Sequence, residues 1–310
     1  MTYEERLTEI AERNADVVVM TAENRAAIRN LPGRLGSRFI DVGIAEQTLV
    51  GAAAGMALRG RVPVAHALAT FLTMRAFEFI RTDVGVARLP VKFVGALAGF
   101  LSEANGPTHQ ALEDLSLMRG IPGMNVCCPA DEDEMNEALA SVVDDDAPWY
   151  VRYNARQAAF RHRIAFEPGI AEVVTEGNDV ALLTYGCLTR ECYDAARRLA
   201  DIGIAARLVN MRTLKPVDEA AILRAARDTS VVVTVEDHFA IGGLATIVAE
   251  VAAANDVAVR LHPIALPGRW FTPAPLADVL ECEGFSGERL ARRVAAAFRA
   301  RNESRGHVHV

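Results

Sequence analysis

The chain has few aromatic residues and no excess of basic charge. Its 310 residues include 33 Lys and Arg against 40 Asp and Glu, which gives a formal net charge of -7, and aromatic residues make up only 6%. Proteins that bind a phosphate backbone need clustered basic surface, which this balance does not supply. The composition is otherwise that of an ordinary folded protein, with 51% hydrophobic and 24% charged residues. We therefore expect no nucleic-acid partner.

Cysteine is scarce, and its spacing follows no disulfide or metal-binding pattern. The five cysteines are Cys127, Cys128, Cys187, Cys192 and Cys282. An odd number with two adjacent members in an apolar run argues against a set of structural disulfides, and no Cys-x-x-Cys pair is available for zinc. These features predict a reducing compartment and no metal site built from this chain.

Long hydrophobic runs are absent as well. No apolar stretch reaches the length that a membrane-spanning helix needs. The segment from Met1 to Asn14 alternates charges instead of forming the apolar core of a signal peptide. We expect a cytoplasmic protein that does not enter a membrane.

Short runs rich in β-branched residues alternate with longer stretches of helical spacing. In the first half, strands are expected at 17–20, 38–42, 62–66, 91–97, 124–128 and 149–153, and helices at 45–58 and 131–143. In the second half, strands are expected at 179–185, 206–209, 231–235 and near 257–263, and helices at 189–201, 217–227, 242–255 and 286–301. Such alternation predicts βα units around parallel sheets. The expected fold class is α/β, with two doubly wound α/β/α domains.

Length and one polar segment suggest the domain bounds. A chain of 310 residues exceeds the usual size of a single domain. The segment 154–177 interrupts the alternation with basic residues, Pro168 and glycines, which is typical of a linker. We predict a first domain at 1–157, a linker at 158–175 and a second domain at 176–310, with a frayed tail from Asn302 onwards.

One carboxylate stands where a strand is expected to pass into a helix. The run Asp41-Val-Gly-Ile-Ala-Glu46-Gln is followed by five small residues, Gly51-Ala-Ala-Ala-Gly55, which let another helix approach closely. A glutamate in a first helical turn can simply complement the helix dipole. Two later runs favour a functional role: Thr70-Phe71-Leu-Thr-Met74-Arg-Ala-Phe77-Glu and Glu103-Ala-Asn-Gly106-Pro-Thr-His109-Gln110.

In that order and at those separations, the three motifs resemble the pyrimidine-binding domain of transketolases and deoxyxylulose-phosphate synthases. The remainder, with Val235-Glu-Asp-His238 and the turn Ile241-Gly-Gly243, is similar to the transketolase C-terminal domain. The resemblance covers nearly the whole chain. It implies part of a transketolase that depends on thiamine diphosphate.

The resemblance implies a role for each matching residue. The family glutamate at the place of Glu46 hydrogen-bonds a ring nitrogen of the cofactor's aminopyrimidine, so that the cofactor itself acts as the general base. Phe71, Met74 and Phe77 match positions that pack against the pyrimidine, although their spacing of three also suits a plain core stripe on one helical face. His109 matches a histidine of the substrate channel that stabilises charge and shuttles protons.

The substrate-facing positions depart from sugar-phosphate transketolases. Asn105 stands where the family has an aspartate that recognises a sugar hydroxyl, and Leu97 stands where phosphate-handling members carry histidine. Arg152 and Arg156 are candidates to bind a phosphate or carboxylate, because a guanidinium engages such groups through two hydrogen bonds. His66, at the end of an expected strand, is a weaker candidate. We therefore expect an unusual acceptor.

Half of the family's cofactor site is missing from the sequence. No Gly-Asp-Gly run, the start of the family's magnesium-diphosphate motif, occurs in the chain. The resemblance therefore implies that a separate N-terminal (alpha) subunit carries this motif and holds Mg²⁺ and the diphosphate, while this chain is the C-terminal (beta) subunit. An alpha2-beta2 assembly with its active site at the subunit interface is expected.

The leading hypothesis is the transfer of a two-carbon ketol unit from a ketose donor to an aldehyde acceptor, with a sugar or sugar phosphate as substrate. Two enzymatic alternatives remain: the beta subunit of a 2-oxoacid decarboxylase or dehydrogenase, and a deoxyxylulose-phosphate-synthase-like enzyme. Gly106-Pro-Thr-His109 favours transketolase over the first of these. A scaffold paralogue without catalysis is a non-enzymatic alternative, against which the retention of Glu46, Phe71 and His109 together argues.

Overall fold

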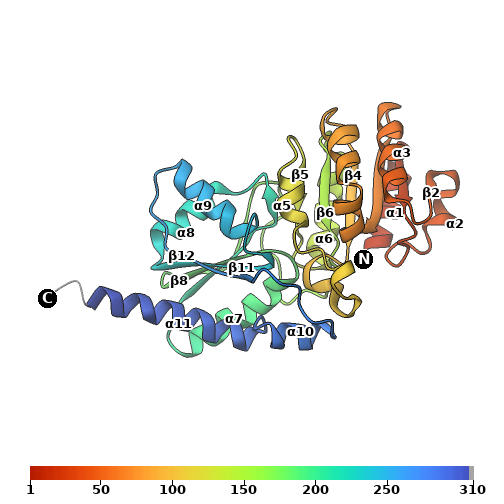
Figure 1. Cartoon of the computed structure of the whole chain (residues 1–310). Helices are drawn as coiled ribbons and strands as arrows, with labels where there is room; N and C mark the ends of the chain where they lie inside the picture. The colour runs from red at the N-terminus through yellow and green to blue at the C-terminus, as the bar shows by residue number, and fades with distance from the viewer. Residues whose placement is uncertain (307–310) are drawn as a thin grey trace.

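Two sheets organise the chain, and each is covered by helices on both faces (Figure 1). The computed structural model describes residues 1–306, with side chains up to residue 300. The first sheet has seven strands in the order β10-β5-β6-β4-β3-β1-β2, and the second has five in the order β12-β11-β8-β9-β7. The pairs β10-β5 and β7-β9 are antiparallel, and the other neighbours are parallel. The predicted α/β fold class is confirmed.

The first sheet separates two groups of helices because its strands alternate their side chains between the two faces. Val17 and Val19 pack with α1 and α6, whereas Val18 and Met20 pack with α3. The strands are β1 (Val17–Thr21), β2 (Phe39–Asp41), β3 (Val62–Leu68), β4 (Lys92–Ala96), β5 (Asn125–Cys127), β6 (Trp149–Arg152) and β10 (Thr213–Lys215). The helices are α1 (Tyr3–Arg13), α2 (Leu31–Leu35), α3 (Glu46–Leu58), α4 (Phe77–Phe79), α5 (Asp114–Arg119) and α6 (Glu132–Asp144). Short helical segments are η1 (Gly36–Arg38), η2 (Phe71–Arg75), η3 (Ile80–Gly85), η4 (Gly99–Asn105) and η5 (Pro107–His109).

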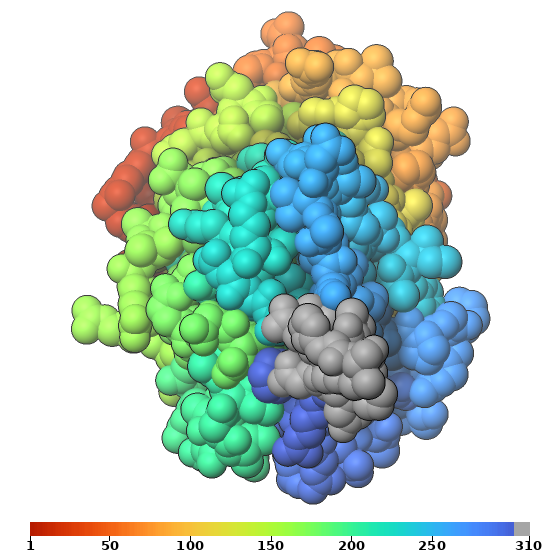
Figure 2. Space-filling model, turned by 90° about the vertical axis from the view of Figure 1, so that its left-hand side faces the viewer, coloured from red at the N-terminus to blue at the C-terminus, as the bar shows by residue number. Residues whose placement is uncertain are grey.

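The second sheet repeats this layering. Its strands are β7 (Glu172–Thr175), β8 (Val180–Thr184), β9 (Ala206–Asn210), β11 (Val231–Phe239) and β12 (Leu261–Leu266). Its helices are η6 (Gly186–Leu188), α7 (Thr189–Asp201), α8 (Glu219–Asp228), α9 (Leu244–Ala254), α10 (Leu276–Cys282) and α11 (Gly287–Gly306). The helices α7 and α11 cover one face, while α8 and α9 lie side by side on the other, as Figure 2 shows from the outer side of this half.

Three predictions about this half are corrected. β7 lies inside the segment predicted as a linker, because a strand of four residues at a sheet edge is too short for its alternation to stand out from a loop. β12 begins at Leu261, four residues later than expected. α11 continues through residues 302–306, which were predicted as a frayed tail, and residues 307–310 lie outside the described part. The domain bounds themselves stay a prediction.

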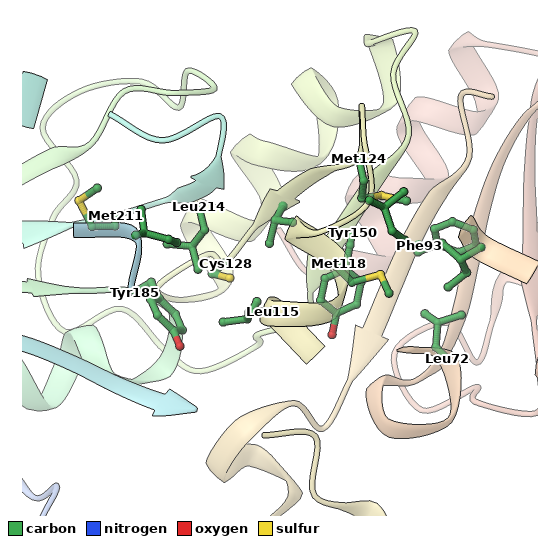
Figure 3. Close-up of a cluster of buried hydrophobic side chains, with 14 of the residues drawn as sticks. Leu72, Phe93, Leu115, Met118, Met124, Cys128, Tyr150, Tyr185, Met211 and Leu214 are labelled. Carbon is green, nitrogen blue, oxygen red and sulfur yellow. The ribbon is translucent and has the colours of Figure 1, made fainter. Parts of the chain in front are cut away.

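A continuous hydrophobic core joins the two halves. Figure 3 shows side chains of one buried cluster running from the first sheet to the second. The first half contributes Leu72, Phe93, Leu115, Met118, Met124, Cys128 and Tyr150, and the second contributes Tyr185, Met211 and Leu214. Strand β10, from the second half of the sequence, also pairs with β5 of the first sheet. Shared packing and a shared sheet therefore set how the halves are oriented. None of the helices in the described residues is both long enough and apolar enough to span a membrane.

Candidate active site

Glu46 is the first residue of α3, directly after the loop that leaves β2. This confirms the predicted passage from strand to helix. Gly43 in that loop has φ of +72°, and nothing lies within 4 Å of the place where its Cβ would stand. The position therefore favours glycine for its backbone conformation and not for lack of space. The loop places the Glu46 side chain, which is buried, at the carboxyl-end edge of the first sheet.

Among the described residues, one cation pairs with this carboxylate. Arg75, the last residue of η2, donates from Nη1 to Oε2 of Glu46 at 3.0 Å. The guanidinium carbon lies 4.2 Å from the centre of the Phe71 ring, within the range of a cation–π contact. The Glu46 side chain is 3% exposed and the Arg75 side chain 44%. The site thus contains a buried carboxylate paired with a half-exposed, stacked guanidinium.

Sequence reasoning missed Arg75, although its spacing was a signal. Residues four apart in a helical segment lie on one side of it and can contact each other. Arg75 is four residues after Phe71, and it is the cation within the motif that carries the predicted cofactor-binding aromatic residue. From that spacing, the guanidinium of Arg75 could have been predicted to lie beside the ring of Phe71.

The segment that carries Phe71 is wound more loosely than an α-helix. The N–H of Ala76 donates to the carbonyl of Phe71 at 3.2 Å, which is the i to i+5 bond of a π-helix. The prediction of a single α-helical face for Phe71, Met74 and Phe77 is therefore wrong. Met74 packs against three buried alanines, Phe77 packs against the core beside α3, and Phe71 packs against Arg75. Their contacts with the cofactor stay a prediction.

The imidazole ring of His109 packs edge-on against the ring of Phe71. The two ring centres lie 5.0 Å apart with an angle of 68° between the planes. The hydroxyl of Thr70 donates to the carbonyl of His109 at 2.7 Å, and Nδ1 of the imidazole lies 2.9 Å from the hydroxyl oxygen of Thr108. The fold therefore brings together Glu46, Phe71, Arg75 and His109, which we call the Glu46 cluster.

The segment 99–110, which contains His109, is held by hydrogen bonds to the second half of the chain. Glu103 accepts a hydrogen bond from the backbone N–H of Leu276 at 2.8 Å. Gln110 donates from Nε2 to the carbonyl of Phe271 at 2.9 Å. Glu103 also has φ of +30°, a conformation that side chains other than glycine rarely adopt and that is found more often at functional sites. The second half therefore helps to hold the position of His109.

Two predicted substrate residues lie in different surroundings. Asn105 is the exposed last residue of η4, and its amide donates to the carbonyl of Ser102 at 2.9 Å. Its substrate contact stays a prediction. Leu97 directly follows β4 and has φ of +57°. These positions leave Asn105 accessible on the same loop as His109.

His66 is a core residue, so the structure lends no support to the prediction that it binds substrate. The ring is buried, with Nδ1 3.2 Å from the carbonyl of Met20 and Nε2 2.8 Å from the hydroxyl of Tyr3. A carbonyl only accepts, so Nδ1 carries the proton and Nε2 accepts from Tyr3. Burial lowers the pKa of His66 to about 4, which keeps the ring neutral. Both nitrogens are taken by groups of this chain.

Arg152 also has its partners inside the chain, so the geometry lends no support to the predicted substrate contact, which stays a prediction. Its Nη2 and Nε donate to the carboxylate of Asp114 at 2.6 and 2.9 Å, and its Nη1 donates to Asp237 at 2.7 Å. Asp114 belongs to α5 of the first half and Asp237 to β11 of the second. Burial favours the neutral acid, yet Arg152 holds the pKa of Asp114 below its usual value. The guanidinium therefore joins the two halves.

Arg156 also links the two halves of the chain. It donates from Nη1 to the carbonyl of Cys187 at 3.0 Å, and its Nη2 lies 3.4 Å from a carboxylate oxygen of Glu191 at the start of α7. Its side chain is 24% exposed. The guanidinium already faces a carboxylate and a carbonyl of the second half, so the geometry lends no support to a contact with a substrate anion, which stays a prediction.

In the described part of the chain, one cluster has the composition of a metal site. Ligand atoms of Glu134, His162 and Glu172 lie within 4.8 Å of one another. Arg212 pairs with Glu134 at 2.6 Å and with Glu172 at 3.1 Å. Burial disfavours a charged imidazole, but hydrogen bonds to Asp131 and Glu172 raise the pKa of His162 to about 10. Two cations of the chain therefore already face these carboxylates, and the cluster is an ion-pair network between the halves.

Fold and site together define an α/β protein in which one guanidinium contacts both a buried carboxylate and an aromatic ring at the edge of a mainly parallel sheet. The chain belongs to the transketolase family: residues 1–159 match the transketolase pyrimidine binding domain, and residues 169–290 match the transketolase C-terminal domain. The resemblance predicted from the motifs is thereby confirmed.

Two relatives are named as transketolase subunits, and both have about the same length as this chain. The 6-deoxy-6-sulfo-D-fructose transketolase subunit SqwH of Clostridium sp. (strain MSTE9) is 38% identical over 258 residues, which cover 82% of this chain and 80% of that protein. One of the subunits of the apulose-4-phosphate transketolase of Phocaeicola vulgatus is 32% identical over 265 residues, covering 84% of this chain and 85% of that protein. A solved split-gene transketolase, described as an inactive beta4 tetramer, has a TM-score of 0.85 and 34% identity over 96% of this chain and 97% of its own.

Proposed function

We propose that this chain is the C-terminal (beta) subunit of a split transketolase, a transferase that depends on thiamine diphosphate. The reaction moves a two-carbon ketol unit from a ketose donor to an aldehyde acceptor. The observation that carries the proposal is the Glu46 cluster, in which a buried carboxylate receives a flat N–H donor beside an aromatic ring. An aminopyrimidine ring is also flat and carries N–H groups at its edge. The cluster therefore fits this end of the cofactor.

Each residue of the cluster has a distinct part in the proposal. When bound, thiamine diphosphate supplies the carbon nucleophile that attacks the donor's carbonyl group. Glu46 holds a proton at the pyrimidine ring nitrogen, and Phe71 offers its ring face for stacking. His109, whose ring lies 5.0 Å from that of Phe71, is placed to move a proton at a substrate oxygen. Asn105, exposed on the same loop, contacts the substrate.

The remaining half of the cofactor site comes from a partner in this proposal. The sequence contains no Gly-Asp-Gly run, so an N-terminal (alpha) subunit with that motif holds Mg²⁺ and the diphosphate in an alpha2-beta2 assembly. The solved relative described as an inactive beta4 tetramer supports the idea that beta chains alone do not turn over. We place the assembly in the cytoplasm, in line with the scarce, odd-numbered cysteines.

The substrate class in this proposal is a sugar with an anionic group. The two named relatives act, by their names, on a sulfonated ketose and on a sugar phosphate. Arg152 and Arg156 are engaged with the second half of the chain. Another residue, of this chain or of the alpha subunit, therefore binds the anion.

The test is reconstitution with the alpha subunit from the same genome. Fructose 6-phosphate is the donor and glyceraldehyde 3-phosphate the acceptor, and both ketose cleavage and carbon dioxide release from pyruvate are measured. We expect transfer by the complex and a loss of at least about 100-fold in kcat for Glu46→Gln, since general acid–base catalysis contributes about that much or more. Glu12→Gln, an exposed glutamate of α1, is the matched control. Carbon dioxide release without ketose cleavage would overturn the proposal.

A calorimetric titration separates the enzyme from a scaffold. Thiamine diphosphate with Mg²⁺ is added to the beta chain alone and to the complex. Binding to the complex alone supports a site divided between two subunits. No binding in either case would identify the chain as a scaffold.

A further inference from the structure

In the free chain, the Glu46 cluster already contains a ligand of its own. The guanidinium of Arg75 donates to the Glu46 carboxylate at 3.0 Å and lies over the Phe71 ring at 4.2 Å. Guanidinium is flat, delocalised and rich in N–H donors, and it both stacks on aromatic rings and pairs with carboxylates. These are the two contacts that the proposed function assigns to the cofactor's aminopyrimidine.

We propose that Arg75 holds the place of the aminopyrimidine in the free chain and must leave Glu46 and Phe71 when the cofactor binds. The inference rests on the proposed function. It makes Arg75 a competitor of the cofactor for this chain's half of the site.

The burial of the two partners explains why such a placeholder is needed. A buried carboxylate without a counter-ion is strongly destabilising. The Glu46 side chain is only 3% exposed, and the ion pair with Arg75 is the one that the structure shows for it among the described residues. Arg75 therefore supplies the counter-ion of the buried Glu46 carboxylate until a ligand with N–H groups replaces it.

The exposure of Arg75 explains how it can leave. Its side chain is 44% exposed, so its guanidinium is already partly hydrated and gains further hydration when it turns into water. Glu78 lies three residues further on, on the short helix α4, and is exposed. Residues three apart in a helical segment can pair, so Glu78 offers a second carboxylate for the displaced guanidinium.

The local winding keeps Arg75 close to both partners. It is the last residue of the π-helical segment η2, in which the N–H of Ala76 reaches back to the carbonyl of Phe71. Single π-helical turns inside helices are frequent at functional sites. The winding places the stem of Arg75 beside Phe71, so that the guanidinium covers the ring that the cofactor needs.

The experiment measures cofactor affinity and not turnover. Thiamine diphosphate with Mg²⁺ is titrated calorimetrically into the reconstituted complex carrying wild-type beta chain, Arg75→Met or Arg81→Met. Removing Arg75 as a competitor should lower the Kd for thiamine diphosphate by about 3- to 10-fold. This is the ratio expected when a competing cation–π contact and a half-exposed ion pair are lost. Arg81 is exposed on the next segment, η3, and has no ion pair in the described part of the chain, so Arg81→Met should bind like wild type.

A Kd for Arg75→Met that is unchanged or weaker would overturn the inference, because Arg75 would then be neutral towards the cofactor or would support it. A merely structural arginine would lower Tm without tightening Kd, so thermal melting is recorded for each variant. If Arg75→Met does not fold, Arg75→Lys decides, since lysine keeps the charge but lacks the flat, stacking group; we expect a smaller tightening of about 2- to 3-fold. Failure of the proposed function itself appears differently, as an absence of binding to the wild-type complex.

Discussion

Arg152 is expected to be essential for the stability of the chain and not for contact with substrate. Its guanidinium donates to Asp114 at 2.6 and 2.9 Å and to Asp237 at 2.7 Å, and all three side chains are buried. Arg152→Met would remove the cation and leave two carboxylates buried near each other without a counter-ion. The same change would uncouple α5 from β11, which belong to different halves.

The expected loss follows from that geometry. Breaking a buried ion pair by removing one partner costs about 3–5 kcal/mol. Unfolding entropy near the melting point is about 2 cal/mol/K per residue, which for a chain of 310 residues gives about 0.65 kcal/mol/K. A loss of about 4 kcal/mol therefore corresponds to a fall in Tm of about 6 °C.

The assay is thermal melting of the beta chain, supported by urea denaturation. Arg197→Met, which removes an exposed arginine from α7, is the matched control and should melt like the parent. An Arg152→Met chain that melts within about 1 °C of the parent, but raises KM for an anionic substrate in the complex, would refute this reasoning. It would show that Arg152 serves the substrate.

Three further predictions concern other buried groups. A Cβ at Gly99 would lie 1.8 Å from Oδ2 of Asp237, and the residue has φ of +57°, so Gly99→Ala should cost more than about 3 kcal/mol in urea denaturation. The pKa of His162 is raised from 6.5 to about 10, so the stabilisation by its charged ring is complete below about pH 6.5 and is lost as pH rises through about 10. The difference in Tm between wild type and His162→Gln should shrink over that range. Burial lowers the pKa of His66 from 6.5 to about 4, so the unfolded chain takes up the proton first and stability falls as pH drops from 6.5 towards 4. In His66→Asn, the Tm should fall less steeply between pH 6.5 and 4 than in wild type.

Each of these has a clear contrary result. A Gly99→Ala chain as stable as the parent would mean that the contact with Asp237 relaxes without cost. A gap between wild type and His162→Gln that stays constant from pH 6 to 10.5 would contradict a charged ring in the ion-pair network. If Tm falls equally steeply between pH 6.5 and 4 in His66→Asn and in wild type, groups other than His66 cause the acid sensitivity.

Most of the fold was predictable because helices and strands carry different periods of apolar residues. The helix α7 begins and ends where the sequence predicted, at Thr189 and Asp201, since its apolar face repeats over several turns. β7 and β10 were missed, with four and three residues respectively. Such short strands are defined by the neighbour to which they bond and not by their own pattern.

The residues of the candidate site also fall into two groups, those that local motifs predict and those whose contacts only the structure shows. Glu46, Phe71 and His109, which the structure brings together, could be selected because they belong to motifs whose residues are close in sequence. The intrachain partners of His66, Arg152 and Arg156 could not be predicted, since the sequence does not show whether the partner of a histidine or arginine is in the chain or in a ligand. The partners of Arg152 are Asp114 and Asp237, which are 38 and 85 residues away from it.

The sequence by itself determined the layered α/β fold, the family and the place of Glu46 at the start of a helix, because these depend on local pattern and on motifs in a fixed order. Only the tertiary structure decided which charged residues remain open to a ligand. Burial and pairing bring together groups from distant parts of the chain, and they turned Arg152 into a link between the halves. They also placed Arg75 beside Glu46, so that this buried carboxylate has a partner within the chain.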